Sequence, residues 1–260
     1  SLHNAHDKRY KTLLGSKKAF LELLQSCIHE EWVQELSEES LVKIDKSYIL
    51  QDFEEKESDM VYEASIKDHR VVFYILVEMQ STVDYLMPYR LLNYIMEIWR
   101  DYVKNLPKNE TRQQSFKLPA VIPLVIYNGT ATWTASRRFR DMIDGYNNFR
   151  EHIVDFEHIL IDVQRYTDED LKAFSKLIGV VFSLEQSVDN VSLLNRLKQW
   201  IQVVKTFSED EYKLLIPWLK ILTYDMPKVQ KESIEDILES AKPWEVDNVI
   251  CFAEEGIRKE

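Results

Sequence analysis

The run VVFYILV at residues 71–77 most strongly constrains the fold, because seven consecutive apolar side chains cannot alternate between a buried and a solvated face. A strand with two apolar faces is typical of the centre of a sheet that is covered on both sides. The run is also far shorter than the roughly 20 residues that a helix needs to span a bilayer. We therefore expect a buried central strand over 71–79 and no membrane-spanning helix.

The sequence around this strand predicts a mixed α/β region followed by helices. Apolar residues at helical spacing predict helices over 6–28, with a break at Gly15 and Ser16, and over 85–106. Short apolar segments predict further strands at 46–53, 59–66, 119–127 and 158–163, and a short helix at 135–143. From Thr167 onward the pattern predicts helices only. The breaks between these helices are expected near Ser183, Ser208, Pro227 and Pro243.

Composition indicates an ordinary globular chain. With 260 residues, of which 45% are hydrophobic, it can bury a sizeable core as one large domain or one domain with an appendage. Cys27 and Cys251 lie almost a chain length apart, so neither a disulfide framework nor a cysteine zinc site is expected. The first residues lack the pattern of a secretory signal. These features favour a cytoplasmic location.

Charge is unevenly distributed along the first half of the chain. Twelve acids against three lysines between Glu30 and Glu63 give a net charge of -9, and nine bases against three acids between Arg90 and Arg140 give +6. The overall charge of -11 argues against a nonspecific nucleic-acid coat, since phosphate binding depends on Lys and Arg. The basic stretch is consistent either with solvated helix faces or with a surface that faces phosphate.

Two carboxylates stand where the predicted hairpin strands leave their apolar runs. If KDHR (67–70) is a four-residue loop, Ile66 pairs with Val71, and the same register places Asp59 directly opposite Glu78. Opposed side chains lie about 5 Å apart on one face, where two like charges repel unless a cation lies between them. Gln80 points to the same face as Glu78.

This pair of carboxylates predicts a site for a hard divalent ion. Mg²⁺ prefers one or two carboxylates together with water and substrate phosphate, and it can acidify an attacking water. The alternative is a pair of solvated carboxylates at a sheet edge, because the register depends on an assumed loop length. The hairpin alone does not decide between an ion site and a pair of solvated carboxylates.

A series of segments extends the comparison beyond the hairpin: HDKRYK, SDMVYEA, YILVEMQST, MPYRLLNYIMEIW and LPAVIPLVIYNG. In this order and at these distances they resemble the recombination-promoting nuclease (Rpn) family, whose members are also described as transposases. That family is part of the PD-(D/E)XK nuclease superfamily. The resemblance covers roughly residues 5–165 and implies a mixed sheet flanked by helices, followed here by an all-helical extension over 166–260.

The resemblance implies a role for each matching residue. Asp59 and Glu78 would be the metal ligands, with the backbone carbonyl of Met79 completing the coordination by Mg²⁺; Mn²⁺ and Ca²⁺ stay open as alternatives. Gln80 stands where the superfamily usually has Lys. An amide can orient water or bind phosphate, but it carries no charge and cannot act as a general acid.

Further residues are candidates for the site or for DNA contact. By the resemblance, Asp7 could reach the metal through water and Lys8 or Lys11 could touch the phosphate backbone, although Asp7 in a first helical turn would also favour the helix dipole. Arg90, on the helix that follows the central strand, could bind substrate phosphate or pair with a nearby acid. Arg137 and Arg138 could contact DNA or form an exposed basic turn.

The sequence and the resemblance together predict a Mg²⁺-dependent DNA endonuclease. The resemblance implies that its cleavage promotes recombination or the movement of a mobile element in a bacterium. A non-catalytic interaction protein that kept the nuclease fold is the alternative, and an RNA-directed nuclease also stays open. In the helical extension acids outnumber bases, which disfavours a DNA-binding arm. We expect the extension to be a structural element or one through which the protein forms homo-oligomers.

Overall fold

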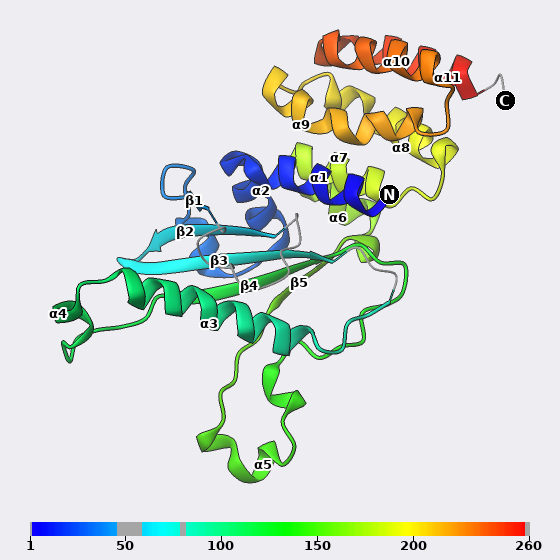
Figure 1. Cartoon of the computed structure of the whole chain (residues 1–260). Coiled ribbons are helices and arrows are strands. Elements are labelled where there is room, and N and C mark those ends of the chain that lie inside the picture. Colours follow the sequence, from blue (N-terminus) through cyan, green and yellow to red (C-terminus); the bar gives the residue numbers. More distant parts are fainter. Residues whose placement is uncertain (1, 46–58, 79–81, 258–260) are drawn as a thin grey trace. The chain divides into compact units, whose positions relative to one another are not determined.

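The computed structural model describes the backbone of residues 2–45, 59–78 and 82–257 (Figure 1). The chain divides into two compact units, and the boundary falls within α2 (Lys17–Cys27). The first unit comprises residues 1–21 and 29–162 and contains the sheet. The second comprises residues 22–28 and 163–260 and is helical. The sequence-based division into domains at residues 165 and 166 stays a prediction.

The first unit is a mixed α/β structure, as the sequence predicts. Its helices and strands follow one another in an order that begins with helices, passes through a hairpin and alternates thereafter. In chain order they are α1 (Leu2–Gly15), the start of α2, the 3-10 helix η1 (Glu31–Glu35), β1 (Val42–Ile44), β2 (Met60–Ile66), β3 (His69–Glu78), α3 (Met87–Asn105), α4 (Lys108–Thr111), β4 (Ala120–Tyr127), η3 (Phe139–Met142), α5 (Tyr146–Phe149), η4 (Arg150–His152) and β5 (Ile159–Asp162).

The sheet has the strand order β1-β2-β3-β4-β5. The pairs β1–β2 and β2–β3 are antiparallel, and the pairs β3–β4 and β4–β5 are parallel. The prediction of a buried central strand is confirmed, because β3 is third of five and residues 71–78 are all buried. This topology brings the start of β2 and the ends of β3, β4 and β5 to the same edge of the sheet.

The hairpin between β2 and β3 corrects the predicted register. Lys67 and Asp68 have φ values of 48° and 63°, so a two-residue turn with both residues left-handed joins the strands, and Ile66 pairs with His69. Such a turn matches the twist of the strands better than a longer loop does, and Asp tolerates the left-handed conformation. The predicted four-residue loop is therefore wrong, and the register shifts by two residues.

Several other elements also differ from the sequence-based predictions. The strand predicted at 46–53 lies outside the described residues. The short strand β1, which the pattern did not reveal, has only three residues with two of them exposed. The helix predicted at 135–143 is reduced to the 3-10 turn η3. Ser183 lies inside a helix, whereas the predicted breaks at Ser208, Pro227 and Pro243 are confirmed.

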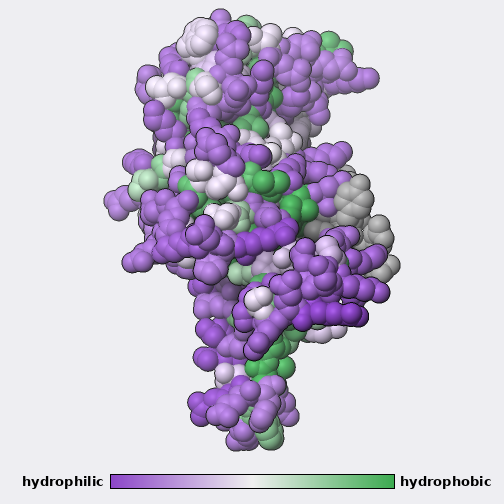
Figure 2. Space-filling model, turned by 90° about the vertical axis from the view of Figure 1, so that its left-hand side faces the viewer, coloured by the Kyte–Doolittle hydropathy of each residue, from purple (hydrophilic) through white to green (hydrophobic). Residues whose placement is uncertain are grey.

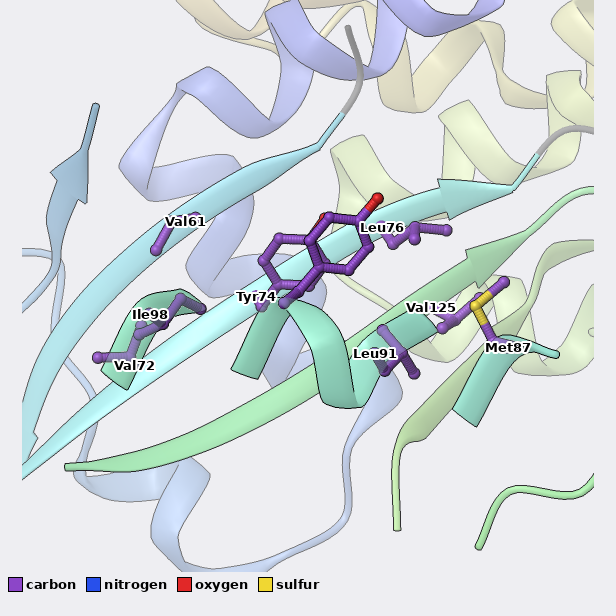
Figure 3. Close-up of a cluster of buried hydrophobic side chains, with 9 residues drawn as sticks. Val61, Val72, Tyr74, Leu76, Met87, Leu91, Ile98 and Val125 are labelled. Carbon is purple, nitrogen blue, oxygen red and sulfur yellow. The ribbon is translucent and has the colours of Figure 1, made fainter. Parts of the chain in front are cut away.

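Helix α3 covers one face of the sheet (Figure 3). A cluster of buried side chains from α3, β2, β3 and β4 forms the core on this side. Within this cluster, the β2 residue has an odd number and the β3 residues have even numbers, which agrees with the pairing of Val61 with Tyr74. The members of the cluster are Val61, Val72, Tyr74, Leu76, Met87, Leu91, Tyr94, Ile98 and Val125.

The N-terminal helices cover the other face of the sheet (Figure 1). Phe20 of α2 stacks on Tyr62 of β2 with ring centroids 4.2 Å apart. The Tyr62 hydroxyl donates to the carbonyl of Leu14 in α1 at 2.5 Å. Tyr62 is therefore a core residue, on the face of β2 opposite that of Asp59.

The second unit is helical, and four of its helices have a side-chain cap at the first turn. Thr167, Ser175, Asp189 and Ser208 each accept a hydrogen bond from a backbone N–H of the following helix, which satisfies donors that have no partner within the helix. The helices are α6 (Asp168–Ala173), α7 (Lys176–Glu185), α8 (Asn190–Val204), α9 (Glu209–Leu219), α10 (Lys228–Ser240) and α11 (Val246–Ile257), with short 3-10 turns between them.

Gly179 allows α7 to pack against α6. A Cβ at this position would lie 2.4 Å from the carbonyl oxygen of Leu171. We expect Gly179→Ala to lower the free energy of unfolding by about 2 kcal/mol, although Ala is the better helix former by about 1 kcal/mol, because the clash is with backbone. Urea unfolding followed by circular dichroism would measure this loss. Gly15→Ala is the control, since its Cβ would meet nothing closer than 3.4 Å; equal stability of both variants would contradict the packing argument.

No helix in the described residues is both long and apolar enough to cross a bilayer. The face of the protein in Figure 2 is largely hydrophilic, with apolar side chains in small separate groups.

Candidate functional site

Asp59 and Glu78 lie at the same edge and on the same face of the sheet. The β2–β3 ladder ends with the pair Met60 and Ile75, so Asp59, one residue earlier, falls opposite Leu76 and diagonal to Glu78. The predicted direct opposition of the two carboxylates is therefore wrong. A shift of two residues preserves the face, however, and diagonal neighbours lie about 7–8 Å apart, within reach of a shared ligand.

Asp59 is almost completely buried, with 1% of its surface exposed. The hydroxyl of Tyr74 donates to Asp59 Oδ2 at 2.6 Å. Burial, and next the negative charge of Asp59, raise the pKa of Tyr74 well above its usual value. Tyr74 therefore keeps its proton and remains a hydrogen-bond donor that fixes the orientation of the carboxylate.

Glu78 is the last residue of β3 and is equally buried, at 1% exposed. Arg90 of α3 lies 3.3 Å from Glu78 Oε2 and also forms an ion pair with Asp84. Burial opposes the charge of Arg90, but the hydrogen bond to Asp84 and the charges of Asp84 and Glu78 outweigh it and raise the pKa of Arg90. Arg90 is therefore a permanent cation beside the buried carboxylate.

Two tyrosines link the carboxylates to this arginine. The rings of Tyr74 and Tyr94 stack with centroids 4.7 Å apart, and Tyr94 is hydrogen-bonded to both Tyr74 and Arg90. Burial and the charge of Asp59 raise the pKa of Tyr94. Asp59 and Glu78 thus belong to one buried polar network, in which a change at one carboxylate can be transmitted to the other.

The row of side chains at this edge continues on the neighbouring strands. Glu78 pairs with Tyr127 of β4, and Tyr127 pairs with Asp162 of β5, so all three point to the α3 face. The Tyr127 hydroxyl donates to the carbonyl of Ala131 at 2.8 Å. Asp162 is a carboxylate of this edge that our sequence analysis did not select.

The donor set fits a hard ion that takes few protein ligands. No group of three or more His, Cys, Asp or Glu side chains with metal-binding geometry occurs within residues 2–45, 59–78 and 82–257. A closed site for zinc or a fully caged ion therefore has no support in this region. Two carboxylates nonetheless match the usual protein ligands of Mg²⁺, which takes one or two carboxylates together with water and phosphate oxygens.

Comparison with known proteins identifies the family of the chain. The model of the family described as putative transposase, YhgA-like, matches residues 4–214. The chain belongs to this family. No curated protein and no solved structure matches the chain.

The match to the YhgA-like family extends further than the series of segments in the sequence suggested. It begins within the first turn of α1, contains the whole sheet to the end of β5, and continues through α6, α7 and α8 into α9. The first helices of the second unit are therefore part of what defines the family, whereas α10 and α11 lie beyond the match.

Four predicted site residues of this family member either lie outside the described part of the structure or are exposed on α1. Met79 and Gln80 lie outside the described residues, as does the side chain of Asp7. Lys8 is an exposed residue of α1. The roles predicted for these four residues stay predictions.

Arg137 and Arg138 lie in the segment between β4 and β5, and both are paired with acids. Arg138 bonds to Asp155 at 2.5 Å and to Glu157 at 3.3 Å, and Arg137 lies 3.3 Å from Glu157. These ion pairs join the residues just before η3 to those just before β5, which also meet in the bridge between Arg138 and Glu157. The DNA contact predicted for the two arginines stays a prediction, and the pairs give them a structural role.

Tyr74, Tyr94, Asp84 and Asp162 were missed by sequence reasoning. The signals were present but weak: Tyr74 precedes Glu78 by four residues on the same face of a strand, and Tyr94 follows Arg90 by one helical turn. Aromatic residues at such positions are usually part of the core, which these two also are. Their hydroxyl groups make them part of the site.

His158 is a further buried titratable group of the first unit. It is fully buried, its ring lies 6.2 Å from that of Trp133, and neither ring nitrogen has a hydrogen-bond partner among the described residues. Burial, and next the charge of Arg137, lower the pKa of His158 to about 4.

This shift predicts acid destabilisation. Between about pH 6.5 and about pH 4 the unfolded chain binds the His158 proton and the folded protein does not, so stability falls as the pH falls through that window. We expect the free energy of unfolding to drop by about 2 kcal/mol between pH 7 and pH 5 because of this residue. His158→Leu should remove that part of the drop, and His152→Leu, at an exposed position, should not. Urea unfolding at both pH values would measure it; an unchanged drop in His158→Leu would contradict the assignment.

Proposed function

We propose that the chain is a metal-dependent DNA endonuclease with a PD-(D/E)XK-like core, in which Asp59 and Glu78 hold the ion. The observation that carries the proposal is the placement of two carboxylates, each 1% exposed, at one edge and on one face of a central sheet. Burial of two acids is costly unless a cation or hydrogen bonds compensate it. Membership of a family of putative transposases supports DNA as the substrate.

Each residue of the site would have a separate role in binding the ion or the substrate. Asp59, oriented by Tyr74, and Glu78, beside Arg90, would supply the protein ligands. When bound, Mg²⁺ would polarise a phosphoryl oxygen and acidify the attacking water. Gln80 would orient that water or a phosphate oxygen through its amide, and the backbone carbonyl of Met79 would be a further ligand. Arg90 would shift from Glu78 to Asp84, with which it is already paired.

A non-catalytic interaction protein is the second candidate, and one observation favours it. Both carboxylates have protein partners in the structure, because Tyr74 donates to Asp59 and Arg90 pairs with Glu78. The network is thus satisfied in part without any ion. A relative that lost catalysis could keep such a network for its contribution to the fold.

Plasmid cleavage tests the choice between the two. The purified chain would be incubated with supercoiled plasmid in Mg²⁺, Mn²⁺, Ca²⁺ or EDTA, with a structured RNA in parallel. Nicking or linearisation that requires Mg²⁺ or Mn²⁺ and stops in EDTA is the expected result. Cleavage of RNA but not of DNA would show that the substrate is RNA. Binding of Mn²⁺ in calorimetry without cleavage of either substrate would favour the interaction protein.

A further inference from the structure

Helix α3 has a second apolar stripe in addition to the one that packs on the sheet. The core cluster takes Met87, Leu91, Tyr94 and Ile98 from this helix. On its outer side, apolar residues recur at alternating intervals of three and four. We call this series the outer stripe, and its last member is the residue that directly follows the helix. The outer stripe consists of Tyr89, Leu92, Met96, Trp99, Val103 and Leu106.

The outer stripe is accessible to solvent. Tyr89, Met96 and Val103, at intervals of seven residues, are 52%, 49% and 39% exposed. Leu92 and Trp99, which lie between them, are half-buried. Single exposed apolar side chains are ordinary on a protein surface, but a row of them along one helix is typical of a contact surface.

The spacing of the outer stripe indicates the kind of partner that it fits. Alternating intervals of three and four place apolar residues at positions a and d of a heptad repeat. On such a helix each side chain inserts between four side chains of a facing helix, whereas a flat surface or a strand does not match the repeat. The partner of the outer stripe is therefore expected to be another helix.

We infer that the outer stripe is the interface of a homodimer, in which α3 packs antiparallel to α3 of a second copy about a twofold axis. Dimers in which one surface patch meets itself are the commonest assemblies of soluble chains. This contact lies in the first unit and not in the helical extension, to which the sequence assigned self-association. The inference goes beyond the proposed function and does not depend on DNA cleavage.

The antiparallel arrangement gives every residue of the outer stripe an apolar neighbour. The twofold axis would pass between Glu97 and Ile98, at the centre of the stripe. The flexible methionine would then fill the space beside the larger indole ring. The opposed pairs are Tyr89 with the partner's Leu106, Leu92 with the partner's Val103, and Met96 with the partner's Trp99.

The charges around the outer stripe also favour a second copy. A net charge of -11 makes two copies of the chain repel each other over much of their surface. The outer stripe contains no carboxylate, and Arg100 beside it is balanced by Glu97 of the same helix at 3.0 Å. In the antiparallel arrangement Arg100 lies near the partner's Asn93, whose amide oxygen accepts hydrogen bonds. Two copies can therefore meet here without unbalanced charge.

Sedimentation velocity of the full chain across micromolar concentrations tests the inference. The sedimentation coefficient of the wild type should rise with concentration from that of a monomer to that of a dimer. Met96→Lys places two ammonium groups close to the twofold axis and should weaken dimerisation at least about 100-fold. Because Met96 is half exposed, the variant should keep its fold, which circular dichroism checks.

Two matched variants show whether the dimer uses the outer stripe. Val42→Lys changes a residue of β1 that is 55% exposed, and Trp244→Lys changes a residue of the second unit that is 59% exposed. Both variants should dimerise like the wild type. Loss of the dimer in Trp244→Lys or Val42→Lys, with Met96→Lys still dimeric, would overturn the inference.

Opposite charges test the antiparallel arrangement. Val103→Lys and Leu92→Glu should each weaken the homodimer. An equimolar mixture of the two variants should recover a dimer, because the introduced ammonium lies opposite the introduced carboxylate in one pair and the other pair is unchanged. In a parallel dimer the two charges would lie three turns apart, so a mixture that stays monomeric would contradict the arrangement. A wild type that is monomeric at every concentration would overturn the homodimer and leave the outer stripe to a helix of another protein.

Discussion

Replacing Asp59 by Asn or Glu78 by Gln is expected to reduce ion-dependent DNA cleavage by at least about 10³-fold. Each change removes one negative charge and one strong ligand while keeping the volume of the side chain. The amide oxygen introduced by Asp59→Asn can still accept from the Tyr74 hydroxyl, so the fold should survive. Initial rates of plasmid nicking in Mg²⁺ would measure the loss.

The control for this prediction lies on β2, the strand that begins directly after Asp59. Glu63 is on the same face of β2 but at its other end, where it pairs with Arg70. Glu63→Gln should therefore cut at the rate of the wild type. If Asp59→Asn and Glu78→Gln also cut normally while circular dichroism shows them folded, the carboxylates are not the catalytic ligands.

Replacing Arg90 by Met is expected to destabilise the ion-free protein by about 2 kcal/mol, because the change leaves Glu78, which is 1% exposed, without its guanidinium partner. Breaking a fully buried pair costs about 3–5 kcal/mol, and the figure is reduced here because a quarter of the Arg90 side chain is exposed. Urea unfolding in EDTA would measure the loss.

The same variant tests whether Arg90 and a metal ion compete for Glu78. Any ligand that binds only the folded protein stabilises it in proportion to its affinity. Mn²⁺ should therefore raise the stability of Arg90→Met more than that of the wild type. Arg100→Met is the control, since Arg100 is exposed and pairs with Glu97 on the surface of α3. Equal stabilisation of all three proteins by Mn²⁺ would exclude competition at Glu78.

Periodicity was enough to predict the central strand and the two helical regions that flank it. The VVFYILV run has two apolar faces, and α1, α2 and α3 have apolar residues at helical spacing, so local sequence and burial agree. The register of the hairpin was not predictable in the same way. Lys67 and Asp68 give no glycine or asparagine signal for a two-residue turn, although both adopt the left-handed conformation.

The candidate site was predictable only in its acidic part. A shift of two residues leaves the face of a strand unchanged, so Asp59 and Glu78 were placed on one face despite the wrong register. The tyrosines that orient the carboxylates could not be separated from core residues, because Tyr74 and Tyr94 are both. Their role follows from contacts between strands and helix that no local pattern encodes.

The position of the ion is the most direct test of the account. Crystals of the full chain soaked in Mn²⁺ would be used for an anomalous difference map. We expect a peak about 2.0–2.3 Å from carboxylate oxygens of both Asp59 and Glu78, with Arg90 bonded to Asp84 alone. An anomalous map with no peak between the two carboxylates, and Arg90 still paired with Glu78, would contradict the proposed metal site.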